Sequence, residues 1–276
     1  MRSHFLLFCA LLFTFHCSEA EGEQKQQAAA VTSNADVQLA TLDWQPYVGQ
    51  DLPNKGYVYQ LVEQIFAEQG LTVNIQFLPF ARIISLAASG QIDGYFPEYM
   101  NEDNAKTFFY SNPYPGGDVG FIKLAKSQMN VKTEKNMTNF TNFSNLQIGV
   151  VRGYINTAAF DSAGYLAKQE TGSDLLNLKK LLFGRIDLAF IDPNVASYLI
   201  STSVEPAFEQ AKGSTYQFID PGLEYKELFT CFPRGVKKSD RLLKAFNQGL
   251  QTLQQSGALD KILLNNGFRN GRYSGG

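Results

Sequence analysis

One short pattern occurs twice in the chain, ninety-four residues apart, and constrains the fold more than any other feature. Residues 90–98 read GQIDGYFPE and residues 184–192 read GRIDLAFID. In each copy a glycine stands where a helix would end, and a buried strand is predicted after it. The aspartate inside each turn is expected to be structural. Two ordinary β-α-β units would explain this repeat. Two similar α/β lobes would also explain it, with the terminal carboxylates Glu98 and Asp192 pointing into one cleft.

Strand-like and helical segments alternate along the chain, which predicts an α/β fold with mainly parallel pairing. Two apolar runs, at 119–124 and 227–232, are candidates for strands that cross between lobes. The other strands are expected at 37–42, 71–78, 92–97, 146–151, 186–191 and 216–219. Helices are expected around 83–87 and at 57–69, 156–168, 175–183, 195–200, 238–255 and 259–265.

The first residues have the features of a secretory signal peptide. Arg2 supplies a positive charge, residues 5–15 are an apolar core, and residues 18–20 (SEA) form a small-residue cleavage site. The apolar run is too short to span a membrane. We therefore predict a signal peptide over 1–20 and a periplasmic location, with a lipid anchor at Cys17 as the alternative. Residues 21–36 lack periodicity and are predicted to be a disordered tail.

Removing the signal peptide removes His4, His16 and two of the three cysteines. The remaining chain has no histidine, which excludes a Ser-His-Asp triad, a Cys-His pair and a zinc site of histidines and cysteines. Cys231 is then alone, so no internal disulfide can form, and it is predicted to be a buried hydrophobic residue. The formal net charge of −2 argues against a nucleic-acid surface. We expect no metal, no cofactor and a monomer.

Aromatic and charged residues follow two of the predicted strands, and loops at strand ends are where ligand contacts collect. Trp44 and Tyr47 come after the first strand. Arg152 and Tyr154 come after the strand at 146–151. These residues are candidates for ligand binding, and a place in the core is the alternative for Trp44 and Tyr47.

Several short motifs within residues 37–268 resemble the polar amino acid type of periplasmic solute-binding proteins, family 3 of the extracellular proteins of ABC importers. Their order behind a signal peptide makes the resemblance specific. The resemblance implies a type II fold of two lobes, joined by two crossing hinge strands, that closes on a ligand. Lobe one would be 37–122 plus 226–276, and lobe two 123–225. The motifs are WQPY at 44–47, Gly56 with its helix, Phe80, SGQID at 89–93, YSNPY at 110–114, IGVVRG at 148–153, GRID at 184–187 and residues 242–268.

The resemblance also implies roles for single residues. Trp44 and Phe80 match the two aromatic residues that sandwich the ligand in this family. Arg152 matches a basic residue that lines the cleft, and Asp192 matches the aspartate that binds the ligand's ammonium group.

The chain departs from the family at Asn104, where an arginine usually grips the α-carboxylate of the ligand. An arginine fork bonds a carboxylate at two points, whereas an asparagine amide carries no charge. One explanation is that Arg82 or Arg152 supplies the charge from another direction. The other is that the ligand has no carboxylate and that Glu98 and Asp192 make the cleft selective for an amine.

These features favour a binding protein that captures a small polar ligand, such as an amino acid, and passes it to an ABC permease or a chemoreceptor in the inner membrane. We expect no catalytic residues. Two alternatives stay open. Glu98, with a pKa raised by burial, could be the acid of a cyclohexadienyl-dehydratase-like enzyme. A stand-alone sensor module would instead signal through a membrane receptor.

Overall fold

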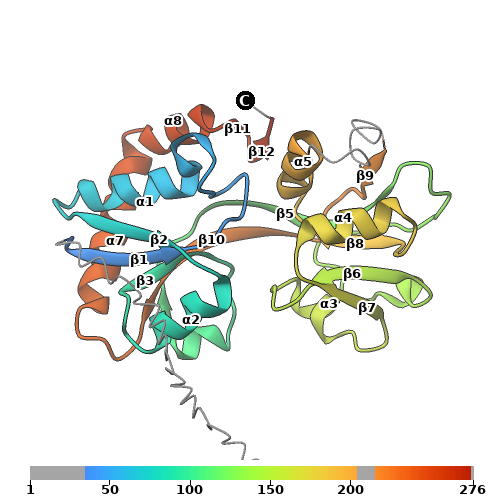
Figure 1. Cartoon of the computed structure of the whole chain (residues 1–276), viewed down its shortest axis with the longest axis horizontal. Helices are drawn as coiled ribbons and strands as arrows, with labels where there is room; N and C mark the ends of the chain where they lie inside the picture. Colours follow the sequence, from blue (N-terminus) through green and yellow to red (C-terminus); the bar gives the residue numbers. More distant parts are fainter. Residues whose placement is uncertain (1–34, 204–214, 275–276) are drawn as a thin grey trace, which may run out of the picture. The chain divides into compact units, whose positions relative to one another are not determined.

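Within residues 35–203 and 215–274, which the computed structural model describes, ten strands form one hydrogen-bonded sheet. The strands are β1 (Val37–Thr41), β2 (Val73–Phe77), β3 (Gly94–Glu98), β4 (Phe108–Tyr110), β5 (Tyr114–Leu124), β6 (Gln147–Val151), β7 (Ala167–Thr171), β8 (Leu188–Ile191), β9 (Tyr216–Phe218) and β10 (Glu224–Pro233). Their order is β2-β1-β3-β10-β5-β8-β6-β7, with β4 beside β10 and β9 beside β5 (Figure 1). A separate hairpin consists of β11 (Phe268–Arg269) and β12 (Arg272–Tyr273).

The helices are α1 (Tyr57–Ala67), α2 (Phe80–Ala88), α3 (Ala158–Ser162), α4 (Asp174–Leu182), α5 (Pro193–Thr202), α7 (Ser239–Gln255) and α8 (Ala258–Asn265). Helices α1, α7 and α8 pack against one another, because each has a stripe of buried apolar side chains at helical spacing (Figure 1). Gly249 permits the close crossing of α1 and α7, since a Cβ atom at this position would overlap the carbonyl oxygen of Ile65.

The sheet contains two similar sets of parallel strands. The connections β1-α1-β2-α2-β3 and β6-α3-β7-α4-β8 have the same order, and β1 and β6 are the middle strands of their sets. The repeat extends well beyond the nine residues visible in the sequence, because β7 and α4 begin and end ninety-four residues after β2 and α2. The predicted α/β fold is therefore confirmed. Each set brings the carboxyl ends of its strands to one edge.

The helix predicted over 156–168 is wrong in its second half. Helix α3 ends at Ser162, and residues 167–171 form β7, which pairs in parallel with β6 from Gln147 opposite Ala167 to Val151 opposite Thr171. The predicted pattern was local, whereas the strand is stabilised by hydrogen bonds to a neighbour twenty residues earlier in the chain.

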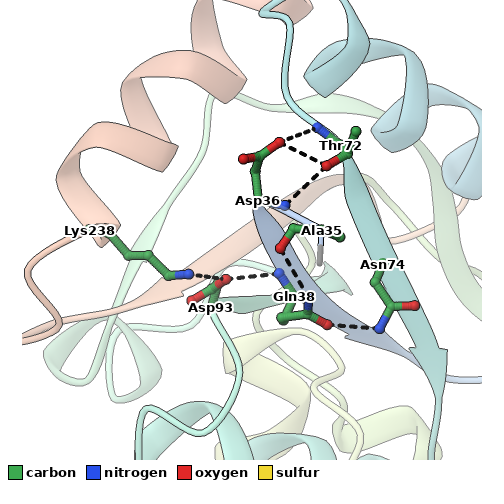
Figure 2. Close-up of polar contacts among 7 residues, drawn as sticks. All are labelled: Ala35, Asp36, Gln38, Thr72, Asn74, Asp93 and Lys238. Atoms are coloured by element: carbon green, nitrogen blue, oxygen red, sulfur yellow. Dashed lines mark hydrogen bonds and ion pairs between the residues drawn. The ribbon is translucent and has the colours of Figure 1, made fainter. Parts of the chain in front are cut away.

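The two turns of the repeat have the same hydrogen bonds. Gly90 and Gly184 have φ angles of 71° and 65°, which only glycine adopts without strain. The Asp93 carboxylate accepts a hydrogen bond from the Gln38 backbone N–H at 2.8 Å (Figure 2), and the Asp187 carboxylate accepts one from the Gln147 N–H at 2.7 Å. Each aspartate thus fastens its turn to the start of the middle strand. The expectation that both are structural is confirmed.

Strands β5 and β10 run side by side between the two sets, as predicted for crossing strands (Figure 1). The first part of β5, up to Val119, pairs with β10, and its second part pairs with β8 and β9. The later part of β10 pairs with β3 and β4. The chain therefore passes twice between the two sets. Cys231 in β10 is fully buried, as predicted.

Among the described residues, no helix is both long enough and apolar enough to cross a bilayer. The predicted signal peptide at 1–20, Cys17 included, lies outside the described residues. Asp36, the last residue of the predicted tail, already belongs to the fold. Its carboxylate accepts hydrogen bonds from the N–H and hydroxyl of Thr72 at 3.0 and 2.7 Å (Figure 2).

Candidate functional site

Three neighbouring cavities lie around Trp44 and Tyr154, at the carboxyl ends of the parallel strands. We call them the outer, central and inner compartments, with volumes of about 880, 50 and 30 Å³. The outer and central compartments share Leu42, Phe80, Gly153 and Tyr154. The central and inner compartments share Trp44, Tyr99, Tyr154 and Ile155. Because they share lining residues, the three compartments are neighbours, and we treat them together as the candidate site.

Aromatic side chains from several elements form the wall of the central compartment. Trp44 follows β1, where a bridge between Trp44 and Val48 closes a tight loop. Its ring stacks on Tyr47 with centroids 4.6 Å apart and meets Tyr99 edge-on at 5.7 Å. Phe80 is the first residue of α2. The complete lining is Leu42, Trp44, Phe80, Pro97, Glu98, Tyr99, Gly153, Tyr154, Ile155 and Leu228.

Glu98 is the one charged residue of that lining, and it is 7% exposed. One carboxylate oxygen accepts a hydrogen bond from the Tyr99 N–H at 2.9 Å, and the other accepts one from the Tyr95 hydroxyl at 3.2 Å. Burial raises the pKa of Glu98 to about 7, although these two hydrogen bonds act in the opposite direction. Glu98 is therefore a buried carboxylate at the end of β3 with neutral hydrogen-bond donors.

The inner compartment holds two more carboxylates. Asp192 caps α5, where it accepts a hydrogen bond from the Asn194 N–H at 2.6 Å and another from the Tyr47 hydroxyl at 2.6 Å. Asp174 is the first residue of α4. Burial raises the pKa of both carboxyl groups to about 7, and the charge of Asp192 adds to the effect on Asp174. Neither the central nor the inner lining includes a lysine or an arginine.

Five of the nine residues predicted to bind ligand line the central or inner compartment: Trp44, Phe80, Glu98, Tyr154 and Asp192. Arg152 lies at the edge of the outer compartment, where its guanidinium forms an exposed ion pair with Glu170 at 3.0 Å.

The other three predicted residues line none of these compartments. Tyr47 is fully buried, and its hydroxyl donates to Asp192 and accepts a hydrogen bond from the Asn194 amide at 2.9 Å. Arg82 is exposed, because Ile83 and Ala87 form the buried face of α2. Asn104 begins the short 3-10 helix Asn104–Lys106.

Sequence reasoning missed Asp174 and Tyr99. The repeat contains the signal for Asp174, because residue 174 follows residue 80 by ninety-four positions and both begin the helix after the second strand of their set. The repeat therefore places an aspartate where the first set has an aromatic residue. Tyr99 directly follows Glu98, and no pattern in the sequence indicates that its ring turns into the site.

The solved structures with similar folds are distant in sequence. A histidine kinase sensor domain with similarity to periplasmic binding proteins has a TM-score of 0.68 at 17% identity, covering 84% of this chain and 96% of that one. The GluR0 ligand-binding core from Nostoc punctiforme in complex with L-glutamate has a TM-score of 0.64 at 15% identity, and the match covers 83% of this chain and 98% of that one. A mutant of the ArgBP protein from T. maritima has a TM-score of 0.65 at 18% identity, and the match covers 82% of this chain and 93% of that one.

No curated protein matches the chain at a significant level. The model of the bacterial extracellular solute-binding proteins, family 3, matches residues 39–266, which include both crossing strands and both sets of parallel strands except the first two residues of β1. The chain therefore belongs to the bacterial extracellular solute-binding proteins, family 3, and has the two-lobed type II fold of periplasmic binding proteins.

Proposed function

We propose that this protein is an extracytoplasmic binding protein for a small organic cation. The observation that carries the proposal is Glu98, a buried carboxylate in a compartment walled by aromatic side chains and without a basic residue in its lining. A cation there would pair with Glu98 and lie against the faces of Trp44, Phe80 and Tyr154, where the aromatic quadrupole attracts positive charge. The aromatic walls also provide apolar contact for the body of the ligand.

An α-amino acid fits this lining less well, because its carboxylate needs a partner. Asn104 and Arg82 line none of the three compartments, and Arg152 is already paired with Glu170 in the outer one. A carboxylate moved into the central compartment would face Glu98, and no basic residue lines that compartment.

In this proposal, a signal peptide exports the chain to the periplasm, where the monomer closes on its ligand between lobe one (37–122 plus 226–276) and lobe two (123–225). Closing movements of this kind are common in two-lobed binding proteins. The loaded protein delivers its ligand to an ABC permease. Delivery of a signal to a membrane receptor is the second candidate, which the likeness to a histidine kinase sensor domain favours.

The raised pKa of Glu98 also supports the enzymatic alternative, because a protonated carboxyl group near neutral pH is a competent general acid. Turnover of prephenate or arogenate by the purified protein would favour a dehydratase. Binding of amines without turnover of either compound would favour the binding protein.

The test uses Trp44, the single tryptophan of the chain, as a fluorescent reporter. The protein is unfolded and refolded to remove bound ligand and then titrated with primary monoamines, their neutral alcohol analogues and α-amino acids. We expect saturable changes with amines and none with alcohols. The E98Q variant should weaken amine binding at least tenfold at pH 8, whereas E102Q, which changes an exposed carboxylate outside the lining, should not. Tight binding of an α-amino acid that E98Q leaves unchanged would overturn the proposal.

A further inference from the structure

Asp174 is a buried carboxylate for which the fold supplies no partner. Asp174 is 8% exposed. No residue in 35–203 and 215–274 donates a hydrogen bond to its carboxylate or forms an ion pair with it. The charge that shifts its pKa is that of Asp192, which is also negative. A buried carboxylate without a partner is costly in its charged form, so above its raised pKa it calls for a positive group or a donor. Asp174 therefore indicates a ligand group in the inner compartment.

The Tyr99 hydroxyl is a second, independent sign of a missing group. This oxygen is buried and has no hydrogen-bond partner among the described residues. Tyr99 lines the inner compartment together with Asp174 and Asp192. Burial raises the pKa of the Tyr99 hydroxyl, and the negative charges of the two aspartates raise it further. A tyrosine hydroxyl can accept a hydrogen bond from a ligand N–H, and it can donate one as well. Tyr99 also connects the two compartments, since its backbone N–H donates to Glu98 and its ring lines both cavities.

The sizes of the compartments restrict what can occupy them. The inner compartment of about 30 Å³ has room for at least one group of the size of a water molecule, and an ammonium group is of that size. The central compartment of about 50 Å³ adjoins it through Trp44, Tyr99 and Tyr154. A linear chain with a small polar group at its end matches this arrangement.

We propose that the ligand is a linear α,ω-diamine, with one ammonium group beside Glu98 and the other between Asp174, Asp192 and the Tyr99 hydroxyl. This inference rests on the proposed function and adds a second cationic subsite to it. Such a ligand brings positive charge to both groups of buried carboxylates and gives the Tyr99 hydroxyl a partner. Its methylene chain lies along the aromatic wall, where it needs no polar contact. A monoamine would leave one of the two anionic subsites without a counter-ion.

The experiment compares diamines of three to six carbons with n-alkylamines of equal length, by calorimetry and Trp44 fluorescence on the refolded protein. The best diamine is expected to bind at least thirtyfold more tightly than its matching monoamine. The corresponding ω-amino acid, such as 4-aminobutanoate for the four-carbon chain, is expected to bind more weakly than the monoamine because its carboxylate would face Asp174 and Asp192.

The variants test which residues form the second subsite. D174N should reduce the ratio of diamine to monoamine affinity at least tenfold, and Y99F should reduce it about threefold. D260N, an exposed aspartate in the first turn of α8, is the matched control and should leave the ratio unchanged. The melting temperature of each variant shows whether it folds, and Y99F provides the test if D174N does not.

Each outcome has a distinct meaning. Equal binding of diamines and monoamines would overturn the second subsite and leave the proposed function intact. A diamine preference that survives both D174N and Y99F would overturn the assignment to the inner compartment. Failure of every amine to bind would overturn the proposed function, and the second subsite with it.

Discussion

Gly117 in β5 lies where three side chains from distant parts of the chain converge. A Cβ atom there would come within 2.9 Å of the Asn194 amide nitrogen and closer still to the Tyr47 hydroxyl and the Asp192 carboxylate. These three groups form a buried network in which Tyr47 donates to Asp192 and accepts from Asn194. The network can therefore form only because residue 117 has no side chain.

We expect G117A to lower the free energy of unfolding by about 1–3 kcal/mol, because it separates buried polar groups that then lose their partners. Urea unfolding of the ligand-free protein measures the change. G164A is the control, since a Cβ atom at residue 164 meets no heavy atom within 4 Å. Equal stability of the two variants would mean that the Tyr47–Asp192 network adjusts at little cost.

The same network shows why the site was only partly predictable at the residue scale. The sequence placed Trp44, Phe80 and Glu98 at strand ends, where the structure has them lining one compartment. It could not show that the Tyr47 hydroxyl would be engaged by Asp192, because this bond joins residues 145 positions apart. The exposed position of Arg82, by contrast, was predictable, because the spacing of Ile83 and Ala87 indicates the buried face of α2.

At the scale of elements, the ninety-four-residue repeat contained more information than the sequence analysis used. Shifting β2 and α2 by this offset gives the bounds of β7 and α4. The same shift would have corrected the helix predicted over 156–168. Some apolar positions are shared by the two copies, as in Ile92 with Ile186 and Phe96 with Phe190, whereas Ile83 corresponds to Asn177. The strand predicted at 71–78, shifted by the same offset, already covers β7. The pairing of each copy with its neighbouring strands appears only in the three-dimensional structure.

The two turns of the repeat predict unequal effects of the same substitution. The Asp93 carboxylate accepts a hydrogen bond from the Gln38 N–H and also forms an ion pair with Lys238 at 2.6 Å (Figure 2). The Asp93 side chain is 7% exposed. The Asp187 carboxylate accepts a hydrogen bond from the Gln147 N–H, and its side chain is more accessible to solvent than that of Asp93. We expect D93A to cost about 2–3 kcal/mol and D187A about 1 kcal/mol, since hydrogen bonds to charged, buried groups contribute more.

Urea unfolding of the two variants tests this order. K238M removes the ion pair but keeps the hydrogen bond from the Gln38 N–H to Asp93. Its free energy of unfolding should therefore lie between those of the wild type and D93A. A larger loss of stability for D187A than for D93A would contradict the assignment of the extra stabilisation to Lys238.

At the scale of the whole molecule, the buried carboxylates make the stability of the ligand-free protein depend on pH. Glu98, Asp174 and Asp192 each have a folded-state pKa of about 7, raised chiefly by burial. In the unfolded chain these groups ionise at their ordinary values near 4. Between about pH 4 and 7 the folded state therefore holds more protons than the unfolded state, so stability falls as the pH rises through this range.

We expect the ligand-free protein to lose about 3 kcal/mol of stability from Glu98 alone between pH 4.5 and 8, and more with both aspartates. The melting temperature should fall correspondingly over this range and then level off above pH 8. E98Q should flatten part of the decline, because glutamine carries no charge at either pH. A bound amine should also oppose the decline, since it supplies the positive charge that the ionised carboxylates lack. A melting temperature that rises steadily from pH 5 to 8 without ligand would show that a positive group of the chain already reaches these carboxylates, and the cation proposal would lose its basis.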